Sequence, residues 1–71
     1  MQSEQIKIVV NGEGRMAPAG QNVRGILAAL GVEADRVAIE MNRTIVRKAD
    51  WDSTEVCDGA ALEIVQFVGG G

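Results

Sequence analysis

The stretch from Gln21 to Val32, QNVRGILAALGV, decides the fold that this sequence predicts. It places apolar residues at positions i, i+3, i+4 and i+7, which is the spacing of one face of an α-helix. These residues are Val23, Ile26, Leu27 and Leu30. A helix with a single apolar face must bury that face against another layer, so the flanking segments are expected to supply a sheet.

Residues that favour helix termini mark both ends of this predicted helix. Asn22 suits the N-cap, where its side-chain oxygen accepts a hydrogen bond from a free amide of the first turn. Gly31 suits the position just beyond the helix, where the backbone turns left-handed. Gly25 costs about 1 kcal/mol relative to alanine inside a helix. We therefore expect the helix to depend on packing across the sheet.

A hairpin is predicted before the helix. Apolar residues alternate along 6–10, the pattern of a half-buried strand. The dipeptide Asn11-Gly12 follows directly and predicts a type I′ turn, because both central residues of that turn need positive φ. A return strand is expected over 13–17, and Pro18 and Gly20 end it.

Three further strands are predicted after the helix. Alternation over 37–42 indicates the third strand, Ile45-Val46 a short fourth one, and 61–68 the last. The intervening RKADWDSTEVCDGA has no clean period and indicates turns or one short helical turn. Residues 33–36 are expected to form a solvated connection.

Together these elements predict one α+β domain, in which a mixed sheet of four to five strands carries one main helix across it. The apolar last strand suits a central position beside the first strand. There are no repeats, so we expect one domain over 1–68, followed by a flexible glycine tail over 69–71.

The composition of the chain argues against several classes of function. The chain has 71 residues, a net charge of −3, one cysteine and no histidine. This charge argues against nucleic-acid binding, which needs clustered Lys and Arg. One thiol without histidine argues against a zinc site and rules out an internal disulfide. No apolar run approaches the ~20 residues of a membrane span, and the N-terminus has no signal pattern. We expect a cytoplasmic protein that does not bind membranes.

Side-chain catalysis has little support. Without histidine there is no Ser-His or Cys-His pair. Cys57 could be a nucleophile or a persulfide carrier, but its neighbours are acidic and include no Lys or His that would favour the reactive thiolate. We therefore interpret it as a small, semi-buried apolar side chain. Trp51 is interpreted as a cover for the core edge rather than as a partner anchor. Asp50 and Asp52 are more simply read as a solvated loop than as a catalytic carboxylate pair.

The C-terminal sequence FVGGG is the most informative functional feature. Val65 and Phe67 should face away from the helix if Leu62 and Ile64 face it, and an exposed apolar pair can mark a docking surface. The glycines could be an engineered linker, a frayed end or a substrate. In the third case three extended residues reach about 10 Å into a partner's narrow tunnel. The terminal carboxylate could then be activated by ATP and passed to a sulfur or amine nucleophile.

Several segments carry a resemblance to a known family. They are VNGE (10–13), PAGQNVRGILAALGV (18–32), VAIEMNRTIVRKADW (37–51) and DGAALEIVQFVGGG (58–71). With the order of elements, they resemble the ubiquitin-like β-grasp proteins and, among these, the ThiS family of sulfur carriers in thiamine biosynthesis. The resemblance covers nearly the whole chain. Gly25 and the pair Ala60-Ala61 depart from the usual pattern of the family, without affecting the tail.

The resemblance implies a mechanism. The Gly71 carboxylate would be adenylated by a ThiF-type enzyme with ATP and converted to a thiocarboxylate with sulfur from a cysteine desulfurase. The product would give its sulfur to thiazole synthase (ThiG). Gly69 and Gly70 would thread the partner's tunnel, and Val65 and Phe67 would dock on partner surfaces. The chain itself would be no enzyme, would bind no cofactor and would be a monomer when free, and Cys57 would not carry the sulfur.

Three alternatives stay open. The small subunit of molybdopterin synthase resembles the chain in fold and chemistry but serves another acceptor. A ubiquitin-like modifier would instead form isopeptide bonds with lysine amines. A small binding module with an engineered glycine tail would carry no acyl chemistry at all.

Overall fold

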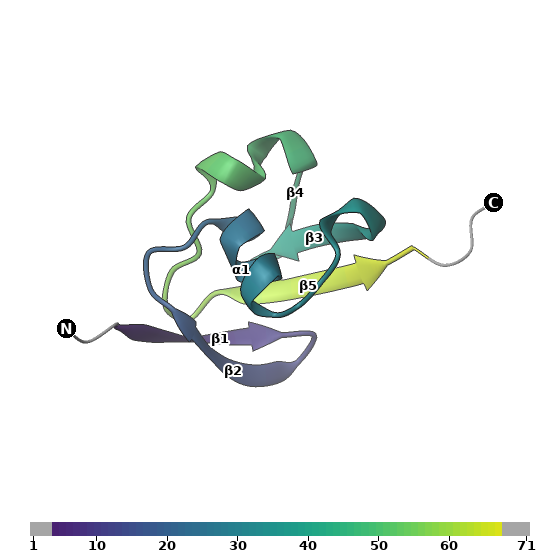
Figure 1. Ribbon diagram of the computed structural model, residues 1–71. Helices are drawn as coiled ribbons and strands as arrows, with labels where there is room; N and C mark the ends of the chain where they lie inside the picture. The colour runs from purple at the N-terminus through teal and green to yellow at the C-terminus, as the bar shows by residue number, and fades with distance from the viewer. Residues whose placement is uncertain (1–3, 68–71) are drawn as a thin grey trace.

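The arrangement of the chain is described by a computed structural model for residues 4–67 (Figure 1). The elements follow one another as a hairpin, a helix, a second hairpin and a last strand, with two short 3₁₀ turns between them. Their bounds are β1 Gln5–Val10, β2 Glu13–Pro18, α1 Val23–Ala29, η1 Ala34–Arg36, β3 Val37–Met41, β4 Thr44–Val46, η2 Lys48–Ser53 and β5 Ala61–Gln66.

The five strands form one mixed sheet in the order β2-β1-β5-β3-β4. β1 and β5 are parallel, with Val9 opposite Ala61, and the other neighbours are antiparallel. The last strand therefore occupies the centre, beside the first. This confirms the predicted α+β, β-grasp fold and the predicted place of the last strand.

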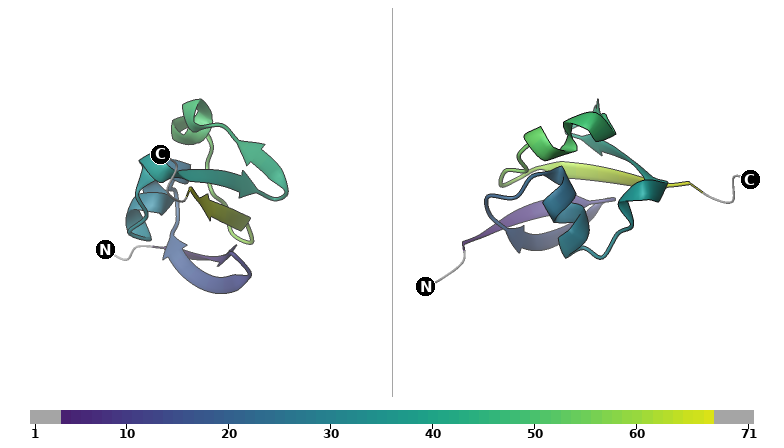
Figure 2. Two further views of the ribbon diagram at one scale, coloured as in Figure 1. Left: turned by 90° about the vertical axis from the view of Figure 1, so that its right-hand side faces the viewer. Right: turned by 45° about the horizontal axis from the view of Figure 1, so that its top comes forward.

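α1 lies across one face of the sheet (Figure 2). Asn22 is its N-cap and accepts a hydrogen bond from the Gly25 amide through its side-chain oxygen at 2.8 Å. Gly31 has a φ of +74° just beyond the helix, as predicted. A Cβ on Gly25 would collide with the end of the Gln21 side chain, so the glycine leaves room for that side chain.

The core fills the space between α1 and the sheet. The most deeply buried large side chains come from β1, α1, β3 and η2 and the segment after it: Ile8, Val23, Ile26, Leu27, Ile39, Trp51 and Val56. Trp51 is 1% exposed, and its indole N–H donates to the Val46 carbonyl at 2.9 Å. This confirms the prediction that Trp51 covers the core edge.

Charged side chains flank Trp51 and tie η2 to α1 and η1. Arg24 and Lys48 lie 5.4 and 5.9 Å from the indole ring centroid. Arg24 pairs with Asp52, and Lys48 pairs with Asp35 in η1 at 2.9 Å. The hydrogen bond from Lys48 lowers the pKa of Asp35 below its ordinary value. Asp52 thus belongs to an ion pair on the surface, in agreement with the solvated-loop interpretation.

Residues 34–36 form a 3₁₀ turn with Asp35 and Arg36 exposed, which agrees with the predicted solvated connection. The ends of two strands were predicted inaccurately. β3 ends at Met41, because Asn42 and Arg43 have φ values of +52° and +70° and form a tight turn into β4. β5 ends at Gln66, and Val68 lies outside the described residues.

Candidate functional site

The end of β5 is the first part of the candidate site, because it leads into the glycine segment. β5 is held from both sides by β1 and β3. The last anchor in the described chain is the Phe67 amide, which donates to the Arg36 carbonyl at 2.8 Å. Gly69, Gly70 and Gly71 lie outside the described residues, so their predicted roles stay predictions.

Two asparagines with positive φ fix β5 between its neighbours. The side chain of Asn11 accepts from the Ile64 amide at 2.7 Å and donates to the Ile64 carbonyl at 3.3 Å. The Asn11 side chain thus makes the bonds to β5 that the backbone of β1 would make if the strand continued. Asn42 accepts from the Ala61 amide at 3.0 Å from the other side. The direction in which β5 runs toward Phe67 therefore depends on these two side chains.

This bracing predicts a stability difference between two matched variants. Asn11→Gly keeps the positive φ accessible but removes two hydrogen bonds, whereas Asn42→Gly removes one. We expect Asn11→Gly to lower the free energy of unfolding by about 1–3 kcal/mol and Asn42→Gly by about half as much. Urea denaturation followed by Trp51 fluorescence measures both. Equal losses, or none, would contradict the bracing role of Asn11.

The sheet face opposite α1 is the second part of the candidate site. No described segment covers this face (Figure 2). The strand register places Val9, Met16, Ile45 and Val65 on it, and Phe67 continues the alternation two residues after Val65. These are all the large apolar side chains that are exposed in the described chain. We call this surface the open face. Clustered exposed apolar side chains are a mark of a protein-binding surface.

Val65 and Phe67 occupy the open face as predicted, with 57% and 58% of their surface exposed. Leu62 is buried and Ile64 half-buried on the helix side. The sequence analysis did not assign Val9, Met16 and Ile45 to this surface. Counting pairs back from the Asn11-Gly12 turn would have placed Met16 opposite Lys7, on the side away from the core. Ile45 could have been assigned to the open face only if the tight turn at Asn42 and Arg43 had been recognised.

The open face also carries a pair of carboxylates at its centre. Glu40 and Glu63 are directly opposite each other on β3 and β5, and both are exposed. Like charges in this position destabilise an antiparallel pair. A cationic group of a partner would relieve that repulsion, so the surface is complementary to one that combines apolar and basic residues.

Cys57 lies near the start of β5, at the opposite end of the strand from Phe67. It is exposed, so the prediction of a semi-buried side chain was wrong. Val56 and Ala60 take the buried positions on either side of the turn, which leaves the thiol outside the core. The hollow beside it is lined by Glu55 and Asp58 and by no Lys or Arg. β5 separates the thiol from Phe67 by about 20 Å of extended chain.

Within residues 4–67 no group of three or more His, Cys, Asp or Glu is placed to hold a metal ion. None of the helices described there is long and apolar enough to cross a membrane.

Comparison with known proteins identifies the family to which this chain belongs. A sequence model described as the ThiS family matches residues 4–71, which is nearly the whole chain and includes the glycine segment. The chain belongs to the ThiS family. This confirms the resemblance seen in the sequence.

Relatives and solved structures agree with this family. The crystal structure of the thiamine biosynthesis protein ThiS from Geobacter metallireducens superimposes with a TM-score of 0.80 at 36% identity, over 93% of this chain and 100% of that one. The sulfur carrier protein ThiS of Bacillus subtilis is 39% identical over 69% of this chain and 74% of its own length. A thiazole synthase of Paramagnetospirillum magneticum is 46% identical over 93% of this chain, which spans only 20% of that relative's length.

Proposed function

We propose that this protein is a sulfur carrier of thiamine biosynthesis, and that its acyl site is the carboxylate of Gly71. The family match, which runs through the glycine segment to Gly71, is the observation that carries the proposal. The fold supports it, because β5 is held at the centre of the sheet and directs the chain toward the glycines. Glycines have no side chain, so the backbone can enter a narrow active site.

The proposed reaction takes place on partner enzymes. A carboxylate has a poor leaving group, so a ThiF-type adenylyltransferase first joins it to the α-phosphate of ATP and releases pyrophosphate. A cysteine desulfurase provides the sulfur as a persulfide, whose terminal sulfur displaces AMP and forms an acyl disulfide. A second thiol then cleaves the S–S bond by exchange, which releases the thiocarboxylate and leaves a disulfide. The carrier supplies the acyl group and the docking surface, while ATP binds to the partner.

Thiazole synthase is the proposed acceptor of the sulfur. The thiazole synthase of Paramagnetospirillum magneticum contains a segment similar to this chain within its own polypeptide. Joining two proteins in one chain raises their effective concentration toward each other, which is useful where they act together. The apolar open face, with Val65 and Phe67 beside the tail, is the proposed contact for both the adenylyltransferase and the synthase.

Intact mass spectrometry tests the carrier function. After incubation with ATP, the adenylyltransferase and the sulfur donor, we expect a mass gain equal to the exchange of one oxygen for one sulfur, located on the C-terminal peptide. Cys57→Ser should show the same gain, because its thiol is far from Phe67 and takes no part. Loss of the gain in Cys57→Ser would place the sulfur on the thiol. An isopeptide-linked product without thiocarboxylate would instead favour a protein modifier.

A further inference from the structure

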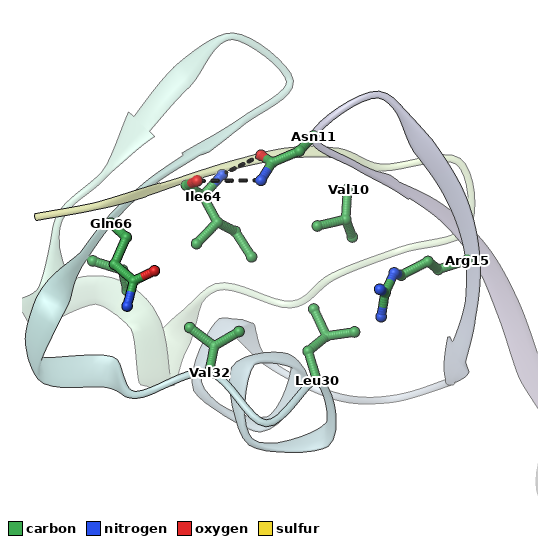
Figure 3. Close-up of a pocket in the computed structure, with 8 residues that line it drawn as sticks. Val10, Asn11, Arg15, Leu30, Val32, Ile64 and Gln66 are labelled. Carbon is green, nitrogen blue, oxygen red and sulfur yellow. Dashed lines mark hydrogen bonds between the residues drawn. The ribbon is translucent and has the colours of Figure 1, made fainter.

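A groove lies on the helix side of the sheet, where β1 ends and β5 continues (Figure 3). Its volume is about 240 Å³. It is lined by residues of β1, the first hairpin, the end of α1, β3 and β5: Val10, Asn11, Arg15, Leu30, Val32, Val37, Ile64 and Gln66. We call it the β5 groove. It is separate from the open face, which lies on the other side of the sheet.

The backbone of β5 has a free edge in this groove. The odd-numbered residues of β5 bond toward β3, as the Phe67 amide does to Arg36. The even-numbered residues bond toward β1: the Leu62 carbonyl accepts from the Asn11 amide, and Ile64 is satisfied by the Asn11 side chain. Gln66 is the next even-numbered residue, so its N–H and C=O point into the groove. No described residue bonds to them.

The side chains of the groove combine an apolar floor with one cation. Leu30, Val32 and Ile64 are half-buried and face the same space. Arg15 stands across the groove from Gln66 in Figure 3. Its guanidinium forms no ion pair or hydrogen bond with any residue in the described range, whereas Arg24 and Lys48 both have carboxylate partners. A guanidinium beside an apolar cleft is a ready site for a carboxylate.

We propose that the β5 groove receives an extended segment of the adenylyltransferase, which adds a strand to the free edge of β5 at Gln66. A side chain of that segment fills the apolar floor, and an Asp or Glu of the segment pairs with Arg15. Strand addition to an unpaired edge is a common mode of peptide recognition, in which main-chain bonds give affinity and side-chain pockets give specificity. The inference rests on the proposed function, because it specifies how the partner holds the strand that leads to Gly71.

Such a contact has a clear consequence for the carrier. With the open face docked on one side and the groove filled on the other, the end of β5 is fixed from both sides. The glycine segment then starts from a defined position, which is what presentation of a carboxylate to ATP requires.

Hydrogen exchange of single amides, read by NMR, tests the contact directly. In the free protein the Gln66 amide should exchange fast, while the Val65 amide is protected by its bonds to β3. In the complex with the adenylyltransferase we expect the Gln66 amide to exchange at least about tenfold more slowly, as a newly formed backbone bond requires. A Gln66 amide that stays unprotected in a saturated complex would overturn the proposal.

Steady-state adenylation kinetics test the side-chain contact. Arg15→Glu should raise the KM for the carrier about tenfold or more through loss of a charge-assisted bond, with kcat little changed. Arg43→Glu is the matched control, because it makes the same charge change in the β3–β4 turn, which lies on the other side of β5 from β1 and does not line the groove. Equal effects of the two variants would overturn the contact with Arg15.

The free N–H is tested by a pair of variants at Gln66. Gln66→Pro and Gln66→Ala both remove the amide side chain, but only proline removes the N–H. Because Gln66 does not bond toward β3, proline leaves the β3–β5 bonds in place. We expect the KM of Gln66→Pro to exceed that of Gln66→Ala about fivefold or more, the effect of one backbone hydrogen bond. Equal KM values would overturn strand addition.

The outcomes separate this proposal from the proposed function. Failure of the unaltered protein to be adenylated would contradict both the carrier function and the proposed contact in the groove. Normal adenylation with an unprotected Gln66 amide would overturn the groove alone. Protection of Gln66 in the free protein would show that residues 68–71 of this chain fill the groove. Protection that rises with protein concentration would assign it to a second copy, and both of these results would also overturn the proposal.

Discussion

One alanine added after Gly71 will abolish thiocarboxylate formation. The extension moves the carboxylate by about 3.5 Å along the chain and puts a methyl group where the partner accepts glycine. Misplacement of a reacting group by about 1 Å can already cost about 100-fold in rate, so we expect at least that loss. Intact mass after incubation with ATP, the adenylyltransferase and the sulfur donor measures it.

The control for this variant is one alanine added before Met1, which should leave sulfur loading intact. The extended protein should still bind the adenylyltransferase with an unchanged Kd, because the proposed docking on the open face does not involve Gly71. Deletion of Gly71 is a weaker test, since Gly70 would then provide a terminal carboxylate. Normal thiocarboxylate formation by the extended protein would show that the reaction does not depend on the Gly71 carboxylate.

Polar replacement of the apolar pair at the end of β5 will weaken partner binding by about 100-fold. Buried apolar anchors of an interface commonly contribute 2 kcal/mol or more each, although such losses are not additive. The double variant Val65→Thr with Phe67→Gln keeps β-branching in the strand and a side chain of moderate length at position 67. Calorimetry with the adenylyltransferase and, separately, with thiazole synthase gives the two Kd values.

The matched control is Val65→Ile with Phe67→Leu, which keeps the surface apolar and should bind within about threefold of the unaltered protein. Both positions are more than half exposed, so neither variant should change the fold. Far-UV circular dichroism and Trp51 fluorescence check this. A Kd of the polar variant within threefold of that of the control would show that partners bind elsewhere.

The residues of the candidate site differ in how far the sequence could predict their positions. Alternation along β5 was enough to place Val65 and Phe67 away from the helix, because a strand turns successive side chains to opposite faces. It could not show that Ile45 reaches the same surface, because Ile45 lies on an edge strand of a sheet whose order is set by long-range pairing. Met16 was predictable in principle, since the local hairpin sets its register. The exposure of Cys57 was also missed, since a turn allows either orientation of the side chain.

The sequence by itself determined the elements whose causes are local. The N-cap at Asn22, the apolar face of α1, the end at Gly31 and the turn at Asn11-Gly12 depend on residues within a few positions of one another, so their chemistry can be read directly from the chain. The family resemblance rested on the same local segments.

Only the tertiary structure decided the features that join distant parts of the chain. The Asn11 side chain bonds to Ile64 across 53 positions of sequence. The Gln66 edge is free because β1 turns away before it, and Arg15 faces a groove lined by β5 and the residues that follow α1. Such contacts arise when the apolar faces of separate elements are buried together, and each element's own sequence is compatible with many partners. The physical reason is that burial selects the arrangement of the elements as a whole, whereas periodicity and turn chemistry act on one element at a time.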